Sequence, residues 1–308
     1  MKLKILGSAA GGGFPQWNCN CPNCDGIRRG TIKAQARTQS SLAISVNGDD
    51  WLLINASPDI LAQIRSNPSL QPARTVRDTG IAAVLVTDAQ IDHVTGLLML
   101  RERGTPLPLY TTESVFRDLS TGFPITSILS HYCGVEHHPI PLDGSAMQID
   151  VLPGVSVTAI PLRSKAPPYS PNRQAPTQGD NIGLFIKNTQ SDASVFYAPG
   201  LGQPEPHVIA AMNRANTVLV DGTLWHDDEM IQLGLSAKTS QDMGHLALCG
   251  SGGMIDVLNG LDTRSHSIRK VLVHINNTNP VLRDDSVERA TLVANGIEVA
   301  TDGMTFEL

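Results

Sequence analysis

Short apolar segments typical of β-strands recur along the chain, and this recurrence limits the fold more than any other feature. They alternate with helical patterns over most of the chain and come in pairs near both ends. The segments are residues 3–6, 41–46, 51–56, 81–86, 155–160, 181–187, 194–199, 217–222, 270–275 and 297–308. We therefore expect an α/β (α+β) chain that forms an αββα sandwich, with two mixed β-sheets flanked by helices. A doubly wound parallel sheet is the rival fold.

The segments between the strands supply candidates for the outer helices. Ser57 is a suitable N-cap, and Pro58 suits the first position of a helix in residues 57–68. The other helical patterns are residues 92–104, 113–123, 205–216, 245–261 and 286–296. No linker-like composition and no repeat divides the chain, so we expect a single domain spanning residues 1–308. The stretch from Arg163 to Asn181 predicts a long loop, either a functional lid or a mobile insertion.

The composition excludes several classes of protein. Hydrophobic residues make up 41% of the chain, so it can bury a substantial core. No apolar run reaches the roughly 18 residues that span a bilayer, and a net charge of −6 disfavours nucleic acid. The lysines and short apolar patch at the start of the chain fit a first strand better than a leader. We expect a cytoplasmic protein that binds neither membrane nor nucleic acid.

Three of the five cysteines lie within six residues, in a stretch that follows a glycine-rich turn. The spacing of Cys19, Cys21 and Cys24 allows three thiolates to converge on one tetrahedral Zn²⁺. We expect a structural zinc knuckle at about residues 18–25, whose fourth ligand comes from elsewhere in the chain. Cys133 and Cys249 are isolated and are expected to be small core residues.

Metal-ligand residues also follow two apolar strands directly. Asp92 and His93 come after the strand at residues 81–86, and His274 ends the strand at residues 270–275. One carboxylate and two imidazoles form the facial triad of mononuclear non-haem Fe(II) oxygenases, which leaves positions open for O₂ and substrate. These three residues are therefore the candidate ligands of an active-site Fe²⁺, although Zn, Mn and Cu suit the same donors.

A succession of motifs carries a family resemblance: LLINASPD, TDAQIDHVTGL, FYAPGLG, VLVDGT, MGHLAL and VLVHINNTNP, in this order. It resembles the order of motifs in the metallo-β-lactamase superfamily. With GSAAGGGFPQWNCNCPNC in front, the chain is similar to the pyrroloquinoline quinone biosynthesis protein B (PqqB) family over nearly its whole length. The resemblance implies an αββα sandwich with its site at the sheet edges. It assigns Asp92, His93 and His274 to the second metal position of the superfamily.

The first metal position of that superfamily is depleted in this sequence. Asp88 and Gln90 replace its two leading histidines, and the loop near Arg163 contains no third histidine. The stretch from Tyr197 to Gly200 lacks the aspartate that bridges the two metals. Because dinuclear hydrolases use both ions to activate water, this departure puts hydrolysis in doubt and indicates a mononuclear site.

The resemblance implies a part in building the cofactor pyrroloquinoline quinone (PQQ) from a Glu and a Tyr of a small precursor peptide. The implied reaction is an iron- and O₂-dependent hydroxylation of the tyrosine ring of a Glu-Tyr unit. Two alternatives stay open: a carrier that transports PQQ or its precursor to the periplasm, and a metal-dependent hydrolase with a reduced site. Contacts with other PQQ-pathway proteins and a homodimer also stay open.

Further residues have both a functional and a structural interpretation. In relatives with a similar knuckle the fourth zinc ligand is a histidine, and Asn277 stands at that position; a water or a nearby histidine is the alternative. His245 corresponds to a histidine near the active site, as a proton shuttle or substrate contact, or is a surface residue. Asp221 could support the site or form a turn, and Asp88 could reach the metal or orient His93.

Basic residues on the long loop are candidates for binding substrate carboxylates. Arg163, Lys165 and Arg173 carry the charge that would pair with a Glu-Tyr substrate. The alternative is that they are solvated loop charges.

Overall fold

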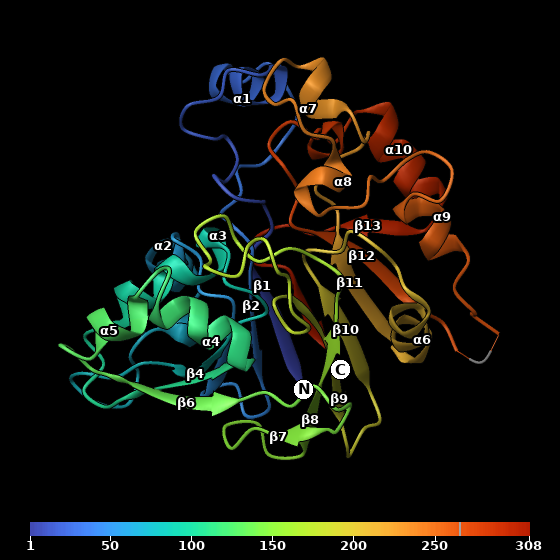
Figure 1. Cartoon of the computed structure of the whole chain (residues 1–308). Coiled ribbons are helices and arrows are strands. Elements are labelled where there is room, and N and C mark those ends of the chain that lie inside the picture. The colour runs from blue at the N-terminus through green and yellow to red at the C-terminus, as the bar shows by residue number, and fades with distance from the viewer. Residues whose placement is uncertain (265) are drawn as a thin grey trace.

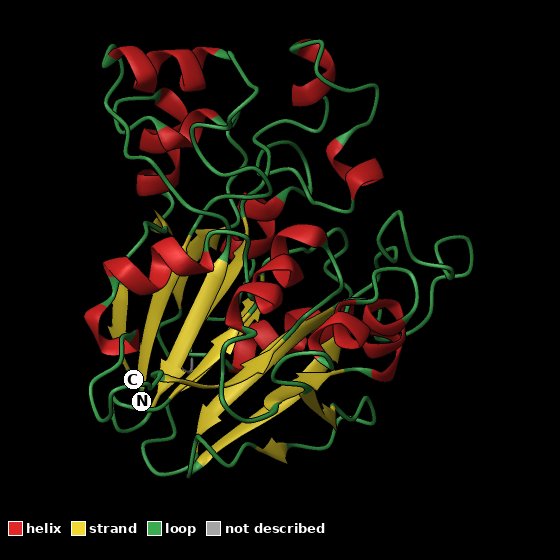
Figure 2. Cartoon of the chain, turned by 90° about the vertical axis from the view of Figure 1, so that its left-hand side faces the viewer, coloured by secondary structure: helices red, strands yellow, loops and turns green. Residues whose placement is uncertain are grey.

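Two seven-stranded sheets pack face to face in the computed structural model, with helices on both outer surfaces (Figures 1 and 2). The structure describes residues 1–264 and 266–308. The arrangement is the expected αββα sandwich of two mixed sheets. The doubly wound alternative is wrong, because antiparallel pairs make up half of each sheet and the two sheets share one inner core.

The first sheet begins with antiparallel pairs and continues with parallel ones. In spatial order its strands are β14 (Thr305–Glu307), β1 (Lys2–Gly7), β2 (Ser41–Ser45), β3 (Trp51–Ile54), β4 (Ile81–Leu85), β5 (Leu107–Thr111) and β6 (Val135–Pro139). The terminal strand β14 pairs with β1, so the two chain ends lie together in Figure 1.

The second sheet has the reverse arrangement, with its parallel pairs first. In spatial order its strands are β13 (Ile297–Val299), β12 (Arg269–Val273), β11 (Thr217–Asp221), β10 (Ser194–Ala198), β9 (Ile182–Asn188), β8 (Val155–Pro161) and β7 (Met147–Gln148). Each sheet therefore gathers the carboxyl ends of parallel strands at one edge, where ligand sites commonly form.

The core between the sheets comes from side chains that alternate along the strands. Leu3 and Ile5 of β1 point inward, with Lys4 between them. From the second sheet, Leu184 and Ile186 of β9 enter the same core. Burial of each such side chain stabilises the fold by about 1.5–3 kcal/mol, which fixes the strand register and the positions of the strand ends.

Helices cover each sheet through separate apolar clusters. Over the first sheet lie α2 (Ile60–Ser66), α3 (Ile91–Val94), α4 (Glu113–Ser120) and α5 (Ile125–Leu129). Over the second lie α6 (Pro206–Arg214), α9 (Met254–Asn259) and α10 (Val287–Ala294). The short helices α1 (Pro22–Arg29), α7 (Glu229–Gln232) and α8 (Ser240–Met243) lie beyond the strand ends, at the top of Figure 1. The described residues also form the 3₁₀ turns η1 (Pro68–Leu70), η2 (Thr95–Leu100) and η3 (Pro280–Leu282).

Three expected helices differ from the observed ones. Instead of one helix over residues 92–104, the chain forms the short helix α3, which ends at Val94, and then the 3₁₀ turn η2, which ends at Leu100. Within residues 57–68 the helix α2 starts after Asp59, because Ser57 accepts the Asp59 N–H in a turn outside the helix. Within residues 245–261 only α9 is helical, since the glycines before it form turns. None of the helices in residues 1–264 and 266–308 combines the length and apolar character that a bilayer crossing needs.

Candidate metal centre

The loop after β4 holds His93 in one orientation. The Nδ1–H of His93 donates to the Asp88 carboxylate, at 2.8 Å from Oδ1 and 2.9 Å from Oδ2. Asp88 is buried and also accepts the Gln90 N–H at 2.9 Å and the Thr87 hydroxyl at 3.1 Å. Because Asp88 holds the Nδ1 proton, Nε2 is the atom that His93 can present to a metal ion. That Nε2 atom is buried and makes no hydrogen bond to the described residues.

His274 is held in a similar way at the end of β12. Its Nδ1–H donates to Thr223 Oγ1 at 2.9 Å, and the Thr223 hydroxyl donates to Asp221 Oδ1 at 2.5 Å. His274 has φ +58°, a left-handed conformation that costs a residue with a Cβ roughly 1–2 kcal/mol. Backbone strain of this kind is frequent at functional sites, where the surrounding contacts impose it.

Three ligand atoms converge between these loops. Asp92 Oδ2 lies 3.2 Å from Nε2 of His274 and 3.8 Å from Nε2 of His93. Two neighbouring ligands of one ion, each at about 2.1 Å from it, lie about 3.0–3.4 Å apart. The observed spacing, together with the unpartnered Nε2 atom of His93, fits a bound metal ion, and all three ligand atoms lie within 4.8 Å of one another.

The electrostatics of this cluster favour a cation. Burial opposes charge on His93, but the Asp88 and Asp92 carboxylates outweigh it and raise the pKa of His93 to about 9. Burial also opposes charge on Asp92, yet the adjacent His93 and His274 lower the pKa of its carboxyl. A metal ion that binds here would take the place of the proton on His93.

A second pair, Asp221 and His245, lies beside His274. His245 Nδ1 lies 2.5 Å from Asp221 Oδ2, and the two imidazole rings of His245 and His274 stack with centroids 5.3 Å apart. Asp221 is fully buried and also accepts the N–H groups of Leu201 and Thr223, both at 2.9 Å. The lone pairs of Asp221 are therefore occupied, and the residue orients His245 directly and His274 through Thr223.

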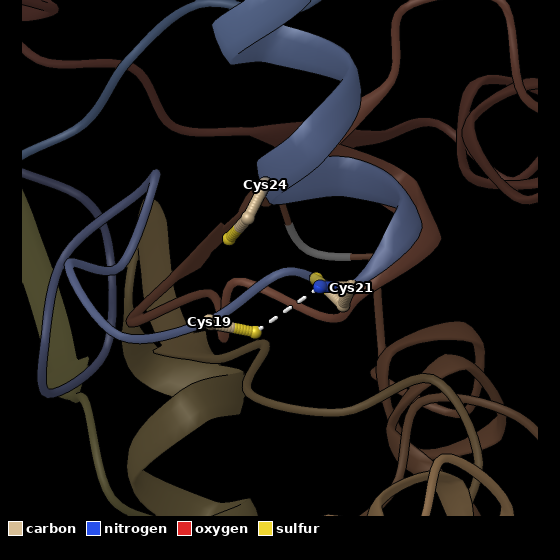
Figure 3. Close-up of side chains that lie close together, drawn as sticks. All are labelled: Cys19, Cys21 and Cys24. Carbon is tan, nitrogen blue, oxygen red and sulfur yellow. Dashed lines mark hydrogen bonds between the residues drawn. The ribbon is translucent and has the colours of Figure 1, made fainter.

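The side chains of the three knuckle cysteines lie close together (Figure 3), with their sulfur atoms within 4.8 Å of one another. Cys24 lies in α1, Cys21 caps that helix, and Cys19 precedes it. Asn277 Nδ2 lies 3.1 Å, 3.3 Å and 3.6 Å from the sulfur atoms of Cys19, Cys24 and Cys21. The amide of Asn277 thus lies close to all three sulfur atoms. A half-turn of that amide would direct its oxygen at a zinc ion held by the cysteines.

Another asparagine, Asn23, holds the segment that carries Asn277. Asn23 Nδ2 donates to the carbonyl groups of Asn277, Thr278 and Asn279, at 3.1 Å, 3.0 Å and 2.9 Å. Because His274 precedes Asn277 by only three residues, one short segment contributes to both clusters.

Two connected cavities surround the triad. The inner pocket, of about 230 Å³, is lined by Asp92, His93, His245 and His274. A wider outer cleft, of about 1250 Å³, contains Arg163 and the neighbouring loop. The two cavities share four lining residues: Gln90, Ser164, Met243 and Gly244.

Sequence reasoning missed several residues in or near the inner pocket. Thr223 connects His274 to Asp221, and Asn55 braces Thr87 with bonds of 3.0 Å to its backbone N–H and its hydroxyl. Asn181 lines the pocket, and its buried Oδ1 has no hydrogen-bond partner among the described residues. These are short polar side chains near strand ends, and residue spacing gave no signal for any of them.

Comparison with known proteins agrees with this fold. The model of the β-lactamase superfamily domain matches residues 50–275, so the chain is a member of that superfamily. A diphosphatase of the PhnP family shares the fold, with a TM-score of 0.68 at 18% identity over 100% of this chain and 97% of that one.

Closer relatives narrow the family. The coenzyme PQQ synthesis protein B of Cupriavidus necator is 62% identical over 99% of both chains, and that of Azoarcus sp. is 59% identical over 100% of both. The Zn²⁺-bound crystal structure of PqqB from Methylobacterium extorquens matches with a TM-score of 0.89 and 38% identity, over 100% of both chains. The chain belongs to the coenzyme PQQ synthesis protein B family, and this membership supports a role in PQQ biosynthesis.

Proposed function

We propose that the protein is an iron- and O₂-dependent hydroxylase that acts on the tyrosine ring of a Glu-Tyr-derived precursor of PQQ. One observation carries the proposal: Asp92 Oδ2 faces the Nε2 atoms of His93 and His274, while the Nδ1 protons of both rings are held elsewhere. A carboxylate and two imidazoles on one side of an ion are the donor set of mononuclear oxygenases.

The depleted first metal position supports this choice over hydrolysis. Asp88 cannot serve as an open ligand there, because its oxygens already bind His93, Gln90 and Thr87. A dinuclear hydrolase needs a second ion to activate and orient water. The remaining triad would hold a single Fe²⁺, which supplies O₂ activation when bound.

The protein's own residues would position the ring and handle protons. Hydroxylation replaces a ring C–H by C–OH and consumes one O₂, two electrons from an external reductant and two protons, with release of one water. His245 lines the inner pocket, and Asp221 holds its Nδ1–H, so its Nε2 atom is available to accept or deliver a proton there. Asn181 Oδ1 would accept a hydrogen bond from the substrate.

Replacement of one ligand tests this function. In His274→Ala we expect loss of Glu-Tyr-dependent O₂ uptake and of the hydroxylated product, with zinc retained at the cysteine knuckle. His226→Ala is the matched control, because His226 is exposed, bonds Cys249 and lies outside the inner pocket. Undiminished turnover by His274→Ala would rule out the proposed site. Zn²⁺-dependent hydrolysis without O₂ would favour a hydrolase, and tight PQQ binding without turnover would favour a carrier.

A further inference from the structure

Four basic side chains line the outer cleft from two sides. Arg163, Lys165 and Arg173 come from the loop after β8, and Arg214 comes from the end of α6. Over residues 1–264 and 266–308, none of the four forms an ion pair with an acidic side chain. Unpaired cations that converge on one cleft favour an anionic ligand.

The acidic residues of the cleft are fewer and partly engaged with the backbone. Asp143 accepts the Ser145 N–H at 2.9 Å, and Asp242 accepts the Thr239 N–H at 3.2 Å. Glu205 occupies the N-cap position of α6, at the opposite end of that helix from Arg214, and its side chain makes no capping hydrogen bond. Basic groups therefore outnumber acidic ones in the cleft lining.

Hydrogen bonds hold in place the loop that carries Arg163, Lys165 and Arg173, called the basic loop below, which lines one side of the outer cleft. The Leu162 N–H donates to the Asn181 carbonyl at 3.0 Å and closes the loop at its base. Tyr169 donates its hydroxyl to the carbonyl of Ala89, in the loop that carries the metal-ligand candidates. Ser170 donates to the buried Asp118 of α4 at 2.6 Å. These bonds hold the basic loop between α4 and the loop that carries Asp92 and His93.

Arg163 and Lys165 stand where the two cavities meet. Ser164, the residue between them, lines both cavities. Its Oγ lies 3.3 Å from where a Cβ on Gly244 would be, so it packs against the backbone beside His245. The backbone that carries the two exposed basic side chains is thus held beside the mouth of the inner pocket.

At the end of α6, a ring contact restricts the orientation of the Arg214 guanidinium group. Arg214 stacks over the Phe185 ring, 4.4 Å from its centroid. Stacking restricts the side chain but leaves its N–H groups free to bind a carboxylate.

We infer that this cleft binds the carboxylates of an acidic, amino-acid-derived substrate, with Arg163 and Lys165 as the residues at the pocket mouth. The reactive ring of the substrate then enters the inner pocket, and its carboxylates lie against the basic loop. The inference rests on the proposed function for the identity of the reacting group. It adds which residues select an acidic substrate over a neutral one.

Binding can be measured apart from turnover. The Zn²⁺-loaded protein, kept free of O₂, would be titrated calorimetrically with Glu-Tyr and with Gln-Tyr amide, in which both carboxylates are replaced. In the double variant Arg163→Gln/Lys165→Gln we expect Glu-Tyr to bind about tenfold more weakly, with the affinity for Gln-Tyr amide unchanged. Arg77→Gln is the matched control, because Arg77 is an exposed cation outside the cleft.

Three results would overturn the inference: no measurable binding of Glu-Tyr to the unaltered protein, equal Glu-Tyr affinity in the double variant, or equal loss of both ligands. Its failure is separable from failure of the proposed function. Charge-dependent binding without O₂ uptake by the iron-loaded protein would refute only the hydroxylase. O₂ uptake that is insensitive to the double substitution would refute only the proposed role of Arg163 and Lys165.

Discussion

At the scale of single residues, the site depends on protons that are held away from the metal position. Asp88 does this for His93, and Thr223 does it for His274. Both imidazoles therefore present Nε2 to the same carboxylate oxygen of Asp92. Of the two roles that the sequence left open for Asp88, to reach the metal or to orient His93, its contacts favour the second.

Substitution of Asp88 should weaken metal binding without removing any of the three ligands. In Asp88→Asn we expect the affinity for Fe²⁺ or Zn²⁺ to fall about 10-fold, within the range of partners that orient ligands. The amide keeps one acceptor but removes the negative charge facing the His93 proton. Competition with a chelating dye measures the affinity, and Asp302→Asn is the control, a largely buried carboxylate that bonds Ser8 and Thr38 instead. Equal affinity in Asp88→Asn and the unaltered protein would contradict this role.

The backbone of His274 gives a stability prediction. Its φ of +58° lies in the region that glycine adopts without a Cβ clash. We expect His274→Gly to have a free energy of unfolding about 1 kcal/mol higher than His274→Ala, although both lose the imidazole. Urea denaturation of the two metal-free variants measures the difference. A more stable alanine variant would show that the strain at this position is absent.

The sequence predicted part of the site at this scale. Asp92, His93 and His274 follow strong apolar strands, so their shared cavity could be predicted from strand ends alone. The structure brings them together. Thr223 and Asn181 could not be predicted, because their partners are set by the packing of separate strands and have no spacing signature.

At the scale of elements, the segment from His274 to Asn279 joins the two candidate metal sites. It provides a ligand atom at its start and, three residues later, the amide that faces the knuckle sulfurs. Asn23 of the knuckle helix holds its carbonyls, and Ala10 donates to the Ile275 carbonyl at 2.8 Å. Hydrogen bonds therefore tie the knuckle to the segment that carries His274.

Loss of the knuckle zinc should consequently affect the distant triad. In Cys24→Ser we expect zinc to leave the knuckle and metal affinity at Asp92, His93 and His274 to fall about tenfold. Cys133→Ser, at a cysteine near α5, should leave both sites intact. Metal analysis of the purified variants, followed by Fe²⁺ titration, measures the two effects. A Cys24→Ser protein that loses zinc yet keeps full affinity at the triad would disprove the coupling.

Most strands with an apolar pattern could be predicted, but β5 (LPLYT) was missed although four of its five residues are buried, because a proline inside a short apolar run argues against a strand. β4 and β12 read directly from runs of buried residues. β6 (VEHHP) was missed because it is a half-exposed edge strand with polar side chains, two of which stack on Phe116 and Tyr110. The expected long helix at residues 245–261 failed because its apolar residues pack from turns.

At the scale of the whole molecule, the sandwich brings together loops from across the chain. Gly11 shows how tight this assembly is, because a Cβ there would lie 3.3 Å from Asp92 Oδ2. The alternation of strands and helices predicted a layered sheet arrangement from sequence. The last expected strand, residues 297–308, instead divides into β13 and β14, which lie in different sheets. The convergence of the basic loop and α6 on one cleft depends on how the sheets pack, which the sequence does not display.

The central claim is that Asp92, His93 and His274 form the iron site of a mononuclear oxygenase. The most direct measurement is bound metal and O₂ uptake together, on protein purified without O₂ and reconstituted with Fe²⁺, with Glu-Tyr as substrate and an external reductant. We expect one zinc and one iron per chain, with O₂ uptake that requires the dipeptide. One zinc alone, with no O₂ uptake in any metal state, would contradict the claim and place the carrier function first.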